Sequence, residues 1–99
     1  MVQNPEAIYI VRDRNVVIRK VGDEMVIVPL VNSVADMTRV LTLNETGTAI
    51  IEALNGQNTI NQVEEQLLQQ FDVERNVLSN DLQVFIDQAL DKQIIEKLA

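Results

Sequence analysis

The spacing of apolar residues changes near Asn44. Before this residue, β-branched side chains form short runs, and after it apolar residues recur every three or four positions as on one face of a helix. The runs at 15–21, 25–30 and 38–43 predict three strands in an antiparallel β-meander, with Gly22 in the first hairpin turn. Residues 8–11 predict a further short strand ahead of the meander.

Two details limit this strand prediction. Pro29 has no N–H to donate to a ladder, so the second strand is expected to end near Val28 or to bulge there. The segment 31–37 between the second and third strands carries no pattern that defines its conformation.

Three helices are expected after the meander. Asn44 has the side chain of an N-cap for the first helix, which Asn55-Gly56 ends. Thr59 begins the second helix with the spacing of a capping box, and Asp72 is the expected N-cap of the third. The apolar positions expected to face the core are Ala49, Ile50, Ile51, Ala53, Leu54, Ile60, Val63, Leu67, Phe71, Leu78, Leu82, Phe85, Ile86, Ala89, Leu90, Ile94, Ile95 and Leu98.

Together these elements predict the α+β fold class, with a three-stranded antiparallel meander followed by three α-helices. The chain of 99 residues contains no linker-like or repeated segment, so we expect one domain over residues 1–99.

The composition removes most catalytic chemistry. The sequence contains no cysteine and no histidine, which excludes thiolate nucleophiles, Cys/His metal sites and imidazole acid–base catalysis. The remaining candidates are the carboxylate pairs Glu64-Glu65 and Asp87 with Asp91, and a solvated helix surface is the favoured interpretation of both. The three glycines are too far apart for a phosphate-binding loop. We therefore expect no enzyme activity, no cofactor and no metal site.

The charge pattern bears on possible partners. The formal net charge is −7, and residues 51–99 carry nine acidic against three basic side chains. A helix from this half would carry the wrong sign to read a nucleic-acid groove. The longest apolar stretch, 25–31, is far too short to span a membrane, and the N-terminus has no signal-peptide pattern. We expect a cytoplasmic protein that binds neither nucleic acid nor membrane.

The third predicted strand lies at the edge of a simple meander, where its unpaired backbone groups form a template for an added strand. Arg39 on this strand has two interpretations of equal weight, a charge that protects the edge or a contact to a ligand.

A family resemblance gives this edge a function. The segment 41–54, LTLNETGTAIIEAL, with its Leu43-Asn44 followed by Gly47, resembles the pyrroloquinoline quinone synthesis protein D (PqqD) family. The resemblance extends from the N-terminal meander to the long third helix, although the aromatic pair common before Leu-Asn is Leu41-Thr42 here. It implies a small winged-helix-like domain without catalysis, which binds the leader segment of a precursor peptide as a strand added to the third strand. The partner enzyme that the resemblance implies is a radical SAM or another peptide-modifying enzyme.

The predicted peptide site has two walls. The strand wall consists of Arg39, Val40, Leu41 and Thr42, and the wall from the third helix consists of Asp81, Val84, Phe85 and Gln88. Leu43, Asn44 and Gly47 are expected to be architectural. The alternative function is a winged-helix-like regulatory or structural protein that dimerises through its sheet edge or binds nucleic acid weakly. The sequence does not define the oligomeric state.

Overall fold

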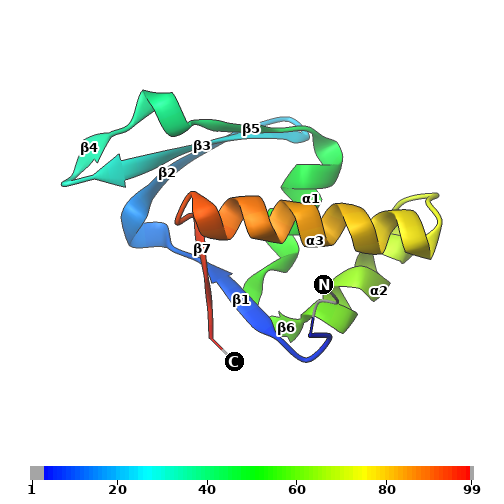
Figure 1. The fold of residues 1–99 in the computed structure, drawn as a ribbon. Coiled ribbons are helices and arrows are strands. Elements are labelled where there is room, and N and C mark those ends of the chain that lie inside the picture. The colour runs from blue at the N-terminus through cyan, green and yellow to red at the C-terminus, as the bar shows by residue number, and fades with distance from the viewer. Residues whose placement is uncertain (1–3, 99) are drawn as a thin grey trace.

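The computed structural model describes residues 4–98, so the first three residues and Ala99 of the expected domain lie outside the described residues. Figure 1 shows one sheet at the top, a second small sheet at the bottom and a long helix crossing between them. The upper sheet contains the meander β2 (Val16–Val21), β3 (Glu24–Val31) and β5 (Leu41–Leu43), with β3 in the centre. The helices α1 (Glu45–Ala53), α2 (Ile60–Gln70) and α3 (Arg75–Asp91) follow, which confirms the predicted α+β class.

The first hairpin forms at the expected place. Val21 pairs with Glu24, and Gly22 adopts φ +60° in the two-residue turn between them. The expected end of the second strand near Val28 is wrong, because β3 continues to Val31. Pro29 is tolerated because its pairing with Val16 is the last of the β2–β3 register, where its missing donor interrupts no further pairing with β2.

The segment without a sequence pattern forms a second turn. Asn32 and Ser33 both have positive φ, and they connect β3 to the two-residue strand β4 (Val34–Ala35). The meander therefore gains a fourth short strand that the sequence did not predict.

The third meander strand is shorter than predicted. Residues 38–40 are not in a strand, because Met37–Arg39 form the 3₁₀ turn η2 and β5 begins only at Leu41. The cause is local, since the Asp36 carboxylate accepts hydrogen bonds from the backbone N–H and the hydroxyl of Thr38. Such a side-chain cap offers the backbone an alternative to the ladder.

The expected strand at residues 8–11 forms as β1 (Ile8–Val11) but does not extend the meander. It lies between β6 (Asn55–Thr59) and β7 (Ile95–Lys97) in a separate antiparallel sheet. Neither β6 nor β7 was predicted, because neither segment has a strand-like sequence. A second 3₁₀ turn, η1 (Asp13–Asn15), connects β1 to β2.

Two of the three expected helix starts are present. The Asn44 side chain accepts a hydrogen bond from the Gly47 N–H, and Thr59 forms a full capping box with Gln62. The N-cap predicted at Asp72 is wrong, since α3 begins at Arg75 with Glu74 as its N-cap residue. Residues 72–74 lie outside the helix, and Val73 is partly buried against the core.

The core lies between the inner face of the meander, the three helices and the small sheet. Leu90 and Leu98, which were expected to be buried, are 37% and 52% exposed. Phe85 is only partly buried. The largest fully buried side chains are Ile27, Leu54, Val63, Leu67, Leu78, Leu82, Ile86, Ile94 and Ile95.

Candidate functional site: an open strand edge beside helix α3

The outer edge of β5 is free in the described part of the chain. On its inner side β5 pairs with β3, with Met25 opposite Leu43 and Ile27 opposite Leu41. On its other side no strand of the described residues pairs with it. Figure 1 shows α3 running below β5 in the opposite direction. The edge therefore faces a space whose second wall is a helix, an arrangement that admits an added strand.

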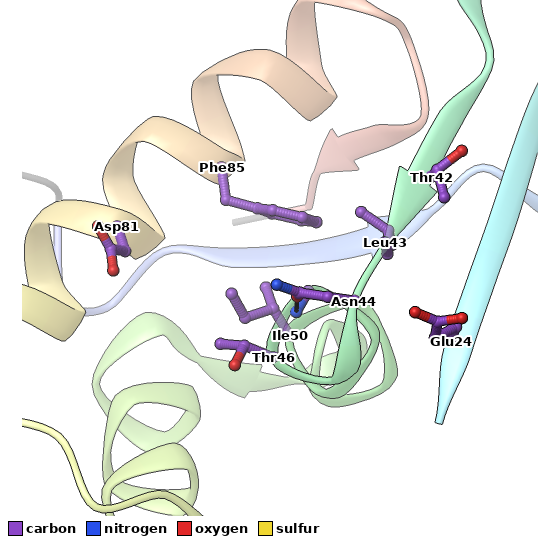
Figure 2. A pocket seen from close by; sticks show the side chains of 9 residues that line it. Glu24, Thr42, Leu43, Asn44, Thr46, Ile50, Asp81 and Phe85 are labelled. Atoms are coloured by element: carbon purple, nitrogen blue, oxygen red, sulfur yellow. Dashed lines mark hydrogen bonds between the residues drawn. The ribbon is translucent and has the colours of Figure 1, made fainter. Parts of the chain in front are cut away.

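A hollow of about 520 Å³ lies at the Leu43 end of this space. Figure 2 shows Phe85 projecting from α3 toward Leu43, with residues of α1 beneath the ring. Apolar side chains supply the floor of the hollow, and two carboxylates, two threonines and one asparagine supply polar groups. The lining residues are Glu24, Thr42, Leu43, Asn44, Thr46, Gly47, Ile50, Asp81 and Phe85.

The start of α1 shapes this hollow. Asn44 Oδ1 accepts the Gly47 N–H at 3.0 Å, and the same side chain lines the hollow. A Cβ on Gly47 would lie 3.1 Å from Leu43 Cδ2 and 3.2 Å from Leu43 Cβ, closer than side chains normally approach. Glycine at this position allows α1 to begin directly against β5.

Arg39 lies at the other end of the space and contacts α3. Its Nη2 donates a hydrogen bond to the backbone carbonyl of Asp91 at 2.8 Å. The pKa of Asp36 is lowered mainly by the hydrogen bond from the Thr38 hydroxyl, and the Arg39 guanidinium lowers it further. Arg39 thus bridges the turn before β5 and the last turn of α3.

The charge of the helix wall is acidic. The one cation of α3, Arg75, donates hydrogen bonds to Glu64 at 2.7 Å and to Glu65, and these carboxylates raise the pKa of the guanidinium. Asp81 has no ion-pair partner among the described residues and lines the hollow. A bound segment would therefore meet an uncompensated carboxylate on α3.

The structure brings part of the predicted site together. Thr42, Asp81 and Phe85 line the hollow, as do all three motif residues. Leu41 packs against the core, and Val84 is 47% exposed on α3. The predicted residues that do not line the hollow are Arg39, Val40, Leu41, Val84 and Gln88.

Three lining residues were missed by the sequence analysis. Glu24 begins β3, and Thr46 and Ile50 lie on α1. Ile50 was assigned to the core, and nothing in the local pattern distinguishes a core residue from one that also reaches the floor of a hollow. Only the pairing of β3 with β5 brings Glu24 near this site.

The comparisons with known proteins agree with this architecture. The family model described as coenzyme PQQ synthesis protein D matches residues 24–95. The chain belongs to the PqqD family. This membership confirms the resemblance inferred from the Leu43-Asn44 and Gly47 motif. No curated protein matches the chain.

A solved structure resembles this PqqD-family chain in fold. It is described as TbiB1 in complex with the TbiA(beta) leader peptide. The TM-score is 0.73 at 21% sequence identity, and the match covers 91% of this chain and 98% of that chain.

Two further findings concern membranes and metals. None of the helices in the described range 4–98 is long and apolar enough to cross a bilayer. Within the same residues, no three Asp or Glu side chains come together in a group that could hold a metal ion.

Proposed function

We propose that this PqqD-family chain binds an extended precursor peptide as a strand added to the β5 edge and presents it to a modifying enzyme. The observation that carries the proposal is the open β5 edge facing the hollow beside α3. The family membership and the shared fold with TbiB1, described with a leader peptide, support it. The enzyme expected from the PqqD resemblance is of the radical SAM class.

Main-chain pairing supplies the first part of the recognition. β5 contains only Leu41–Leu43, so an added strand gains few hydrogen bonds to it. Each backbone hydrogen bond contributes a net of about 1 kcal/mol. Pairing with β5 therefore holds the peptide in the extended conformation but leaves much of the affinity to side chains.

The hollow supplies the second part. Alternate side chains of an added strand point to the same face, so one of every two can enter the space beside α3. Leu43, Ile50 and Phe85 provide an apolar floor for such a side chain. Full burial of a valine, leucine, isoleucine, phenylalanine or methionine side chain contributes about 1.5–3 kcal/mol. The favoured ligand thus has an apolar residue at the position opposite Leu43.

The exposed groups of α3 complete the site. Asp81 and Gln88 offer hydrogen-bonding groups to side chains of the peptide, and Val84 offers apolar area next to them. We assign no chemistry to the chain itself, because its sequence lacks the cysteine and histidine groups on which most peptide modification depends. The modifying enzyme supplies the reaction. A ribosomally made precursor is first available in the cytoplasm, where we place this step.

The test is an amide-shift titration. Synthetic peptides encoded by any short genes that flank this gene are added to ¹⁵N-labelled protein, and the proposal expects amides of 41–43 and 81–88 to shift together. Two peptides are compared, one with methylated backbone nitrogens at its odd-numbered residues and one at its even-numbered residues. Only the peptide whose methylated nitrogens face β5 should lose binding, since the other set of N–H groups points away from β5. Shifts confined to α2, or none with any flanking precursor, would refute the site.

The same amide-shift measurement distinguishes peptide binding from the alternative function, a regulatory or structural protein that dimerises or binds nucleic acid. Dimerisation through the β5 edge would shift the amides of 41–43 with increasing protein concentration and no peptide. Association with nucleic acid would shift amides upon addition of a duplex and would weaken with salt.

A further inference from the structure

The C-terminal end of α3 leaves the backbone carbonyl of Asp91 for a partner outside the helix. Gln93 has φ +59°, and its N–H donates to the Leu90 carbonyl at 3.0 Å. The Ile94 N–H donates to the Ala89 carbonyl at 2.9 Å, and the Lys92 N–H to the Gln88 carbonyl at 3.0 Å. The Gln93 and Ile94 bonds are the two hydrogen bonds of a Schellman cap, and the Lys92 bond continues the helical pattern, so the carbonyls of Gln88, Ala89 and Leu90 are all satisfied.

The next carbonyl, that of Asp91, accepts a hydrogen bond from Arg39. The bond of 2.8 Å joins residues 52 positions apart in the chain. Within residues 4–98 it is the one side-chain hydrogen bond that connects η2 or β5 to α3. A positive charge at a helix C-terminus is also favoured by the helix dipole. The contact therefore ties the strand wall of the site to the helix wall at one end.

The edge that remains free for an added strand is short. The N–H groups of Asp36, Thr38 and Arg39 already donate to acceptors within the segment or on β3. Only residues 40–43 can pair with an added strand. An added strand lies about 4.7–4.9 Å from its neighbour, so α3 must lie at a matching distance for the peptide side chains to reach it.

We propose that Arg39 is a positioning residue of the peptide site, which holds α3 at the separation from β5 that an added strand requires. The inference rests on the proposed function. It differs from the expectation that Arg39 pairs with a peptide carboxylate, because here the guanidinium acts through the Asp91 carbonyl and need not touch the peptide. Because α3 is already held at this separation in the free protein, less conformational freedom is lost when the peptide binds.

The first experiment measures the separation in the free protein. The chain has no cysteine, so Thr42→Cys with Gln88→Cys accepts one nitroxide on each wall. Dipolar spectra should show a broader distance distribution when Arg39→Gln is added. Arg19→Gln, which removes the same charge from an exposed residue of β2, should leave the distribution unchanged. An unchanged distribution in Arg39→Gln would overturn the inference.

The second experiment measures affinity without the cysteine substitutions, using the synthetic leader peptide that shifts the β5 amides. Arg39→Gln should weaken binding by about tenfold, the size of one charge-assisted hydrogen bond. The ratio of the Kd of Arg39→Gln to the Kd of the wild type should stay the same at low and high salt. It should also stay the same when each peptide carboxylate is replaced by its amide. A ratio that falls toward one in either series identifies direct ion pairing and contradicts the positioning role.

The two proposals fail in different ways. If a peptide binds at β5 and Arg39→Gln binds it as tightly as wild type does, the positioning role is wrong and the proposed function stands. If no peptide shifts the β5 amides of the wild-type protein, the proposed function is wrong and the positioning role falls with it, whatever the nitroxide spectra show.

Discussion

Asn44 has two roles that one substitution series can separate. Its Oδ1 caps α1 through the Gly47 N–H at 3.0 Å, and its side chain also lines the hollow. Asn44→Ala removes the cap acceptor and leaves the N–H of the buried Gly47 without this partner. Loss of an N-cap costs about 1 kcal/mol and up to about 2 kcal/mol. For a domain of this size, each 1 kcal/mol lowers the thermal midpoint by about 4–8 °C.

The control for this prediction is Asn44→Asp. Aspartate keeps an oxygen acceptor for the Gly47 N–H and places a negative charge where the α1 dipole favours it, so the midpoint should equal or exceed that of wild type. It removes Nδ2, which donates to no group of the described residues. Thermal unfolding followed by circular dichroism gives the stabilities, and peptide titration gives the affinities. If Asn44→Ala unfolds at the wild-type midpoint, the capping argument is wrong. If Asn44→Asp is stable but loses the peptide, the Asn44 amide belongs to the binding site.

Three further predictions concern single positions elsewhere in the fold. The pKa of Asp36 lies below its usual 3.8 mainly because the Thr38 hydroxyl donates to it, so this contact stabilises the fold above pH 3.8 and is lost as the pH falls through the lower native pKa. A carboxyl-carbon NMR titration should show a midpoint below 3.8 that moves upward in Thr38→Val, and a wild-type midpoint at or above 3.8 would contradict the contact. Gln93→Gly should raise the unfolding free energy by about 0.5–1 kcal/mol in urea melts, because φ +59° strains a side chain but not glycine, and a destabilised variant would disprove this. Gly56→Ala should lower the unfolding free energy by about 1–3 kcal/mol, since its φ is +81° and a Cβ would lie 2.9 Å from Ile10 Cδ1. Gly22→Ala is the matched control, with φ +60° and open space around the new methyl group, and equal losses in the two variants would show that the contact with Ile10 contributes nothing.

The sequence determined the elements whose signals are local. The β2–β3 hairpin, the cap at Asn44 and the capping box at Thr59 each depend on residues a few positions apart, and the structure contains all three. The apolar stripe of α3 also identified its buried face, because side chains three and four positions apart share one side of a helix. The family motif lies within one short segment as well, which is why the PqqD relationship is visible in the sequence.

The tertiary structure decided what depends on distant partners. β6 and β7 are strands because β1 lies between them, and the sequence NGQNT of β6 shows no strand pattern of its own. A local contact can also override a strand pattern, since the Asp36 cap places residues 38 and 39 of the predicted strand in a 3₁₀ turn. Glu24 joins the hollow, and Arg39 reaches the Asp91 carbonyl, only after β3, β5 and α3 have packed. Such contacts join residues tens of positions apart, and periodicity along the chain contains no information about which distant groups meet in space.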